Sequence, residues 1–535
     1  MNRYVCILFV VSIFASPSGA QIVLQDFLVN NSAQNTLGVG RTAIAAAPNG
    51  NFAVAWQDHN EYGSPIPAMP RVAVQMFNAN VVPIGTLNLF NGETRAGIVY
   101  MNDFLTGNID LEFVPSGSLL VGVHHEGLFD NLVTTFWSWE TGIGAVSSTG
   151  QVIDLRSGTG VILWLFPFDL VDNGNLRLAI TPAGNFFGVL DGPSYDTDKS
   201  AVLIQQFDAN ANLVGNYFTP YDDPGPNFYH AFPDIGTNGN IHIAVWQDSR
   251  QDANYDINAQ FFNNVAPIGT NQQVNNGDPA GTTNILPSVS MNAAGNSVVV
   301  WGDSRLGLLG EIFGQRFNAS GQPVGNNFQI SAGEGVITDR AEVAMRDDGS
   351  FMVVWTDSTV GVRGINSFRA RARQFDSNGN PLSAPFILPN QDVPSGLANI
   401  GTNGALYYCS WLDVRLDNVT PNVYAKILGN ITGIDDQISW AGIPADYILN
   451  QNFPNPFNSS SVIKYSIPKL SDVTIKIFNT LGEELETLIS EEKPAGTYEL
   501  EFNTSSIKHQ PSSGVYFYQL RAGDFISTKK MILLR

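Results

Sequence analysis

The side chains best suited to bind a ligand lie in two stretches of the N-terminal half of the chain. His124, His125 and Glu126 bring two imidazoles and a carboxylate together, and Trp137 and Trp139 alternate so that both rings are on one side of a strand. Exposed aromatic rings beside carboxylates suit a sugar. We therefore predict a ligand site in this region. The second stretch adds four further candidates to it: Asp191, Tyr195, Asp196 and Asp198.

No catalytic constellation accompanies these residues. The sequence has no His-Glu-x-x-His zinc motif, no Cys-rich metal pattern, no Gly-x-Ser-x-Gly elbow, no phosphate loop and no Ser-x-Asp-x-Gly-x-Thr-Trp box. We expect no catalytic residue, no metal and no cofactor, and we favour a non-catalytic binding module for an extracellular glycan or protein. The alternative is an extracellular hydrolase or lyase that acts on polysaccharide through two carboxylates, which sequence spacing cannot test.

The element that would carry such a site is a repeat. Aligned on a Gly before an apolar strand, the chain divides into seven units spaced by 54 to 67 residues, and the second and third are the longest. The aligned glycines are Gly50, Gly117, Gly184, Gly239, Gly295, Gly349 and Gly404. The strand that follows carries Trp56, Val123, Leu190, Trp246, Trp301, Trp355 and Trp411 at one position. Because units two and three lack the Trp, either they hold the site or they have merely drifted and their own Trp rings are buried.

Each unit reads as a four-stranded antiparallel meander. In unit five the strands are expected at 287–291, 297–301, 311–317 and 327–331, with tight turns between them. The second strand is apolar on nearly every residue, so both of its faces must be covered by neighbouring sheets. We predict an all-β chain with a seven-bladed β-propeller over residues 21–430, and a linear solenoid is the alternative. Residues 22–29 resemble the fourth strand that unit seven lacks, and they should close the ring.

The repeated Trp residues are interpreted as core anchors between blades. The Asp two residues later, at Asp58, Asp248, Asp303, Asp357 and Asp413, can accept turn N–H groups or pair with a following Arg. A ring of these carboxylates binding a cation is the other possibility. Arg369, Arg371 and Arg373 lie on one face of a third strand, where inter-blade ion pairing is expected.

Composition excludes some partners. The chain has 535 residues and a net charge of -21, yet its last 90 residues hold 9 basic and 10 acidic side chains, so the acidity belongs to the repeat region. Such a field repels phosphate backbones, and we expect no nucleic acid partner.

The chain begins like an exported protein. Arg3, a short apolar run and small residues before Gln21 are typical of a secretory signal peptide over residues 1–20. No later segment has the roughly 20 apolar residues of a membrane span, so none is expected. With Cys6 in the leader, Cys409 is left without a partner and should be a buried, inert thiol.

After a linker at 431–445, residues 446–535 form a different unit of about six alternating strands, predicted as a small Ig-like β-sandwich. Its landmarks are an Asn-Pro-Phe start, a Gly-Val-Tyr-Phe-Tyr strand and a Lys-Lys-Met ending. In this sequence they comprise Asn455, Pro456, Phe457, Gly514, Tyr516, Gly523, Lys529 and Lys530. These residues resemble the type A C-terminal sorting domain of type IX secretion substrates of Bacteroidota. One departure is Ser459 after Asn458, where that family usually has a Pro.

The resemblance implies a destination and a partner. Members of that family cross the inner membrane by the general pathway, fold in the periplasm and are recognised through this domain by the outer-membrane type IX machinery. The passenger would then be secreted or anchored on the outer surface of a Gram-negative bacterium. The ligand of the propeller itself stays open at this point.

Overall fold

The computed structural model contains two compact units, Met1–Ile434 and Asp435–Arg535. It describes residues 26–30, 41–58, 71–90, 99–104, 109–130, 135–150, 152–153, 163–164, 175–193, 200–222, 229–250, 254–307, 310–333, 336–337, 339–358, 368–415, 421–429, 448–452, 454–467, 471–493, 496–504, 512–523 and 525–534. Within these ranges every regular element is a β-strand, and no helix is long and apolar enough to cross a membrane.

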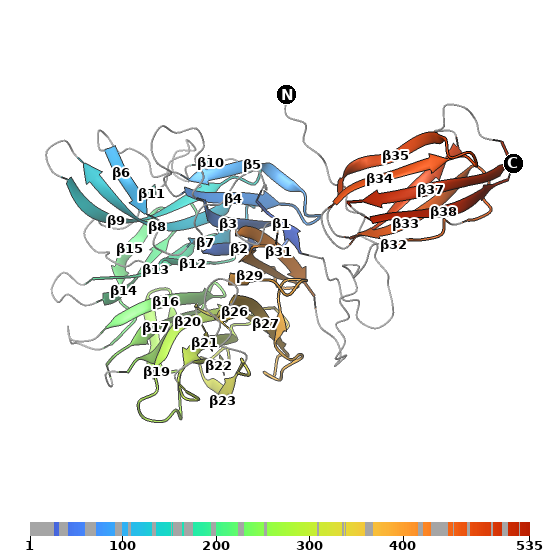
Figure 1. Ribbon diagram of the computed structural model, residues 1–535. Helices are drawn as coiled ribbons and strands as arrows, with labels where there is room; N and C mark the ends of the chain where they lie inside the picture. Colours follow the sequence, from blue (N-terminus) through green and yellow to red (C-terminus); the bar gives the residue numbers. More distant parts are fainter. Residues whose placement is uncertain are drawn as a thin grey trace. The chain divides into compact units, whose positions relative to one another are not determined.

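The strands of the first unit form small antiparallel sheets that follow one another along the chain (Figure 1). Sheet 1 contains β2 (Thr42–Ala46), β3 (Phe52–Asp58), β4 (Arg71–Phe77) and β5 (Pro83–Phe90). Sheet 2 contains β6 (Val99–Phe104), β7 (Ile109–Phe113), β8 (Leu119–Asp130), β9 (Thr135–Val146), β10 (Val152–Ile153) and β11 (Leu163–Trp164). Sheet 3 contains β12 (Arg177–Ile180), β13 (Phe186–Pro193), β14 (Ser200–Phe207) and β15 (Leu213–Phe218).

The later sheets repeat this order. Sheet 4 contains β16 (His230–Thr237), β17 (His242–Asp248), β18 (Asp256–Asn263) and β19 (Ala266–Gln273). Sheet 5 contains β20 (Asn284–Met291), β21 (Ser297–Asp303), β22 (Glu311–Phe317) and β23 (Pro323–Gln329). Sheet 6 contains β24 (Val336–Ile337), β25 (Glu342–Met345), β26 (Phe351–Ser358), β27 (Phe368–Phe375) and β28 (Phe386–Ile387). Sheet 7 contains β29 (Ser395–Thr402), β30 (Tyr407–Asp413), β31 (Asn422–Leu428) and, from the N-terminus, β1 (Phe27–Leu28).

The aligned glycines make the turn between the first two strands of each unit. All seven have positive φ, from 83° at Gly349 to 95° at Gly239, a region that other residues enter only at a cost. In unit five the fourth strand starts at Pro323, earlier than the predicted 327. The register of β22 and β23 shifts between Gly314 and Arg316, and this β-bulge accommodates the additional residues at the start of β23.

The second strand of each unit is covered on both faces, as its sequence predicts. In β21, Val298 and Val300 belong to the core shared with sheet 6, whereas Val299 and Trp301 belong to the core shared with sheet 4. Trp56, Trp246, Trp301, Trp355 and Trp411 are all essentially inaccessible to solvent. The interpretation of these rings as core anchors is therefore confirmed.

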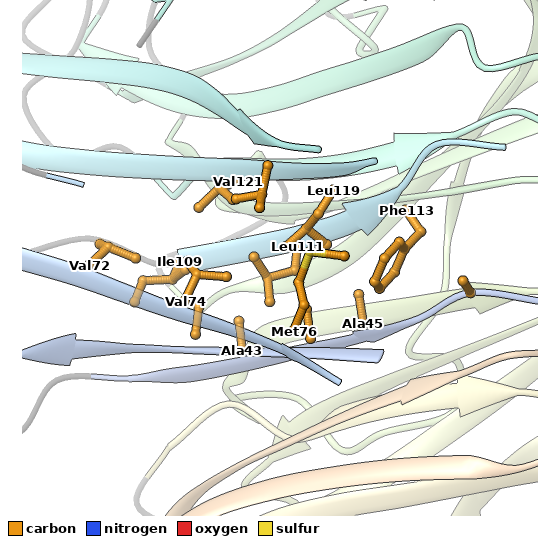
Figure 2. Close-up of a cluster of buried hydrophobic side chains, with 14 residues drawn as sticks. Ala43, Ala45, Val72, Val74, Met76, Ile109, Leu111, Phe113, Leu119 and Val121 are labelled. Atoms are coloured by element: carbon orange, nitrogen blue, oxygen red, sulfur yellow. The ribbon is translucent and has the colours of Figure 1, made fainter. Parts of the chain in front are cut away.

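Shared hydrophobic cores join each sheet to the next and the last sheet to the first. Figure 2 shows the core between sheets 1 and 2, where Val74 and Met76 of β4 meet Ile109, Leu111 and Phe113 of β7. The ring closes through a core that contains Val54 and Trp56 of sheet 1 together with Tyr408 and Val423 of sheet 7. At the inner edge of this junction, Ile44 N donates to Asn399 Oδ1 at 3.2 Å. The first unit is thus a β-propeller-like ring.

The N-terminal strand completes sheet 7. Phe27 lies opposite Ala425 and Leu28 opposite Tyr424, and Val29 N donates to Val423 O at 2.8 Å. Asp26 adds an ion pair to Arg415 at 2.6 Å. The predicted pairing of this segment with the last unit is therefore present over its described part, and residues 22–25 lie outside the described residues.

The second unit contains two antiparallel sheets around one core. One sheet contains β32 (Ile448–Leu449), β33 (Ser460–Ile467) and β36 (Gly496–Asn503). The other contains β35 (Glu484–Lys493), β34 (Ser471–Phe478), β37 (Gly514–Ala522) and β38 (Phe525–Leu533), in that spatial order. Ile463 and Tyr465 of the first sheet pack with Ile475, Tyr518 and Leu520 of the second.

Candidate functional site

Part of the predicted ligand site lies on two long neighbouring strands of sheet 2. In the register of β8 and β9, Glu126 is opposite Trp139 and His125 is opposite Glu140, while Leu128 is opposite Trp137. The backbone therefore brings together the segment that contains His124 and the segment that contains the two Trp residues. The side chains of these residues, and all of Tyr195, Asp196 and Asp198, lie outside the described structure.

Asp191 lies apart from these segments, on β13 of sheet 3, and its carboxylate is buried. One oxygen accepts Phe232 N at 2.7 Å, and the other accepts Asn175 N at 2.7 Å. Burial raises the pKa of Asp191 despite these hydrogen bonds. In this arrangement the carboxylate ties sheet 3 to β16 of sheet 4.

Three of the repeated Asp residues, Asp248, Asp303 and Asp413, have an architectural role. Trp246 Nε1 donates to Asp248 Oδ2 at 2.9 Å, and Arg250 N donates to Asp248 Oδ1 at 2.8 Å. Asp303 and Asp413 make the same contacts with the Trp before them and the Arg after them. The expected pairing with turn N–H groups and with a following Arg is therefore found at these positions.

Two further expectations concern sheets 6 and 7. Arg371 binds Asp357 of the same sheet at 2.5 Å, so the inter-blade interpretation is wrong for it, whereas Arg369 binds Asp392, in the segment that joins sheet 6 to sheet 7, at 2.5 Å. Arg373 does reach another sheet, since its Nη1 donates to Ile330 O at 2.7 Å.

Cys409 is buried, and burial raises its pKa to about 12, which agrees with an inert thiol.

A set of polar residues that the sequence analysis missed occupies one position on the innermost strands. In each unit, the residue at this position faces the residue that directly precedes the Trp position on the paired second strand. From sheet 1 to sheet 7 it holds Ala43, Asp110, Arg177, Asp234, Ser288, Glu342 and Asn399. Alignment of the inner strands on the Trp position would have revealed that six of these seven residues are polar.

Three of these side chains brace neighbouring sheets in the same way. Asp110 Oδ2 accepts Leu178 N at 2.6 Å, and Asp234 Oδ2 accepts Val289 N at 2.8 Å. Asn399 makes the equivalent bond to sheet 1, as described above. Each acceptor thus satisfies a backbone donor on the innermost strand of the next sheet, which fixes the inner strands relative to one another.

An ion pair spans the ring between sheets that are not neighbours. Arg177 Nη2 on sheet 3 contacts Glu342 Oε1 on sheet 6, and Arg177 Nη1 lies 3.8 Å from Asp110 Oδ1 on sheet 2. Ser288 Oγ on sheet 5 donates to Glu342 Oε2 at 3.1 Å. Side chains from four sheets therefore meet at the centre of the ring.

Arg340, just before β25, extends this centre toward sheets 4 and 5. Its Nε donates to Pro287 O at 2.7 Å, and its Nη2 donates to Phe232 O at 3.1 Å and Pro233 O at 3.0 Å. These carbonyls belong to bulges in which Phe232 and Leu286 have φ values of 52° and 55°. The guanidinium thereby holds two strained backbone segments in place.

We call Asp110, Glu112, Arg177, Asp234, Arg340 and Glu342 the axial cluster. Glu112 belongs to it because it follows Asp110 by two residues on β7 and shares its face, while Ile109, Leu111 and Phe113 fill the opposite core. Water reaches the cluster, since 18% of the Asp110 side chain and 12% of the Glu342 side chain are exposed.

The cluster shifts the pKa values of its carboxyl groups in opposite directions. Burial raises the pKa of Asp110 to about 7, against the lowering effect of Arg177, and raises the pKa of Glu112 well above its usual value. Burial also acts on Glu342, but the charges of Arg177 and Arg340 outweigh it and lower the pKa of that carboxyl. Burial and the nearby Arg177 lower the pKa of Arg340 to about 10.

Such an arrangement can do acid–base chemistry. A carboxyl that keeps its proton near neutral pH can donate it, and a neighbouring carboxylate can stabilise positive charge or activate water. Among the described residues, no group of three or more His, Cys, Asp or Glu side chains is placed to hold a metal ion.

In the second unit, the expected sorting residues meet at the last strand. Phe457 is buried, and its N–H donates to Ile532 O at 2.9 Å. Asn455 Oδ1 accepts Ile532 N at 2.9 Å, so Asn455 and Phe457 of the Asn-Pro-Phe segment are both hydrogen-bonded to β38. Gly514 and Tyr516 lie on β37, Gly523 makes the turn to β38 with a φ of 57°, and Lys529 and Lys530 lie on β38, where Lys530 is exposed.

Comparison with known proteins agrees with this last assignment. Residues 451–534 match the family of secretion system C-terminal sorting domains, and the chain is therefore a substrate of type IX secretion. The domain implies an interaction with the type IX machinery and export to the surface or the surroundings of a Gram-negative, Bacteroidetes-type bacterium. No curated protein matches the chain significantly.

Solved structures resemble the chain only distantly. A Dyadobacter fermentans protein of unknown function has a TM-score of 0.43 at 9% identity, over 76% of this chain and 99% of its own. The polysaccharide lyase Uly1 has a TM-score of 0.45 at 8% identity, over 74% and 90%. The α-L-arabinofuranosidase Arb93A of Fusarium graminearum has a TM-score of 0.41 at 9% identity, over 76% and 98%. At these values the similarities do not bear on the function of this chain.

Proposed function

We propose that this type IX secretion substrate is an extracellular enzyme that cleaves a polysaccharide by acid–base catalysis at the axial cluster. The observation that carries the proposal is the contrast between Asp110, whose pKa is about 7, and Glu342, whose pKa is lowered by two guanidiniums. Pairs of carboxyl groups with pKa values pushed apart are typical of acid–base sites. This favours the enzyme over the non-catalytic module that the motifs alone suggested.

In this proposal Asp110 is the general acid and Glu342 the ionised partner. Both carboxyl groups lie beside the same guanidinium, that of Arg177, which places them close enough to act on one bound sugar. Glu112 is a second protonated group on the same face of β7. It would donate a hydrogen bond to a bound sugar hydroxyl or share the proton transfer.

The fold that we propose around this site is a seven-bladed β-propeller. The described strands of the first unit form seven sheets, and seven shared cores join them in order, which supports one blade per sheet. We also propose a signal peptide at 1–20, a propeller at 21–430, a linker at 431–445 and an Ig-like sorting sandwich at 446–535.

A screen of the purified full-length protein against polysaccharides tests the enzyme. We expect new chain ends on at least one polymer, and a loss of about 100-fold or more in Asp110→Asn, because a general acid contributes 10²- to 10⁴-fold. Asp208→Asn is the matched control, since Asp208 is a partly exposed carboxylate in the turn between β14 and β15, outside the axial cluster. Absence of cleavage on every polymer, or full activity in Asp110→Asn, would reject the proposal.

The second candidate function is non-catalytic binding of a glycan or protein at the predicted site on sheet 2. It is supported by the length of β8 and β9, 12 residues each against 5 to 8 in the strands of sheet 1. This extension carries His124, His125, Glu126, Trp137 and Trp139. A glycan array with wild type and with His125→Ala separates the candidates, because binding without cleavage that depends on His125 favours the module.

A further inference from the structure

We propose that the substrate of the axial cluster is an uncharged polysaccharide and that its linkage is broken by hydrolysis rather than by β-elimination. This inference rests on the proposed function and deepens it by naming the substrate class. It follows from the partners that the positively charged side chains of the cluster already have within the protein.

A uronic acid polymer places a carboxylate in the site. Cleavage by elimination requires that this carboxylate be neutralised, so that the adjacent C–H becomes acidic enough to lose its proton. A cation or a metal ion that is not already bound to a protein carboxylate provides this neutralisation most strongly. Binding of sulfated or uronic chains without cleavage has the same requirement, because an unpaired buried anion is costly.

The two guanidiniums of the cluster already interact with groups of the protein. Arg177 is bound to Glu342 and faces Asp110. Arg340 donates to Pro287 O and to two further carbonyl oxygens, and it faces the carboxylates of Asp234 and Glu342.

Arg41, whose charge contributes to the lowered pKa of Arg340, is also engaged. Arg41 pairs with Asp339 at 3.4 Å, between sheets 1 and 6. Arg41, Arg177 and Arg340 thus all lie beside acidic side chains of the protein.

The two guanidiniums of the cluster need no ligand to offset their charge. They lie among Asp234 and Glu342, while burial raises the pKa of Asp110 to about 7 and that of Glu112 well above its usual value. An anionic ligand would add uncompensated negative charge, and a sugar bearing only hydroxyls would not. The acidity of the whole repeat region acts in the same direction, because a net charge of -21 repels polyanions at a distance.

The hydrolytic step balances with water as the only co-reactant. Asp110 gives its proton to the glycosidic oxygen as the bond from that oxygen to the anomeric carbon breaks, and the Glu342 carboxylate stabilises the positive charge on the sugar ring. Water supplies its oxygen to the anomeric carbon, and the proton that it loses returns to the Asp110 carboxylate. The products are one new reducing end and one new alcohol.

The test uses the full-length protein with neutral polymers (arabinan, galactan, xylan and a mixed-linkage glucan) and acidic ones (polygalacturonate, alginate and a sulfated glucuronan). Reducing ends measure all cleavage, and ultraviolet absorbance of unsaturated uronic ends measures elimination alone. We expect reducing ends from a neutral polymer, at a rate at least about tenfold above any acidic polymer, with no absorbance change. Asp110→Asn should abolish this activity while Asp208→Asn retains it.

The possible failures are distinguishable. Cleavage of an acidic polymer with unsaturated ends, or faster cleavage of acidic than of neutral polymers, overturns the inference and leaves polysaccharide cleavage standing. Lack of cleavage on both sets rejects the proposed function and the inference with it. Circular dichroism of each variant verifies that a loss of activity is not a loss of fold.

Discussion

The guanidinium of Arg177 on β12 binds the carboxylate of Glu342 on β25 and so joins sheets 3 and 6, although sheets 4 and 5 lie between them in the ring. The two residues are 165 positions apart in the chain. This contact brings Asp110, whose pKa is raised to about 7, close to Glu342, whose pKa is lowered.

Removal of one partner of this pair should lower the free energy of unfolding more than removal of both. Glu342→Gln leaves the buried guanidinium of Arg177 without its counter-charge, and we expect a loss of about 3 to 5 kcal/mol in the free energy of unfolding. The double variant Arg177→Met with Glu342→Gln should recover much of this loss, because no uncompensated charge remains. Urea unfolding of the singles and the double measures the coupling; additive effects would show that the pair is not coupled.

Asp110 should make the protein less stable as the pH rises. Its pKa is 3.8 in the unfolded chain and about 7 in the folded one, so between these values the folded state binds more protons and the free energy of unfolding falls with increasing pH. Asp110→Asn cannot ionise, and we expect it to exceed wild type by on the order of 2 kcal/mol at about pH 8, an amount reduced for partial solvent access. The difference should vanish near pH 4.

Thermal unfolding across this pH range checks the prediction. Asp208→Asn is again the control, because its hydrogen bonds with Asn212 lower the pKa of Asp208, and this variant should gain no stability at high pH. If Asp110→Asn is no more stable than wild type at about pH 8, Asp110 is not held protonated in the folded protein. The same ionisation should reduce catalysis above about pH 7, because the general acid loses its proton.

The N-terminal strand should stabilise the whole ring. Val29→Pro removes the N–H that donates to Val423 O and should lower the free energy of unfolding by about 3 kcal/mol. Val29→Ala keeps this hydrogen bond and serves as the control for the side chain. Denaturant unfolding compares the two; an equal effect of both substitutions would mean that the strand contributes through packing and not through its ladder bond.

The second unit should direct export. Substitution of an exposed and of a buried residue distinguishes its recognition by the secretion machinery from its folding. Deletion of 446–535 should leave the first unit in the periplasm. Lys530→Ala alters an exposed side chain, so export should decrease while the fold is kept, whereas Phe457→Ala empties a buried position and should cost about 3 to 5 kcal/mol. Cell fractionation measures export; normal export of the deletion variant would contradict the assignment.

The sequence by itself determined the features that depend on neighbours in the chain. The glycines that turn each hairpin, the Trp anchors of the second strands and the Trp-x-Asp-x-Arg contacts around Asp248, Asp303 and Asp413 recur at nearly constant positions within their units, because each is a local requirement of one repeated unit. The sorting unit was equally evident, since its landmarks at Asn455 to Phe457 and at Lys529 and Lys530 lie in one short segment. The pairing of the N-terminal strand followed from a missing partner in the last unit.

Only the tertiary structure decided where the chemistry lies. Asp110, Arg177 and Glu342 come from three units and occupy one position on the inner strands, where the residue type varies from sheet to sheet, so an alignment marks the position as polar but does not show which of its side chains meet. Their pKa values arise from burial and from charges that meet only when the ring closes. Asp191, which the sequence pointed to as a ligand group, was instead buried as an acceptor of Phe232 N, because a strained bulge on the next sheet leaves that N–H without a strand partner.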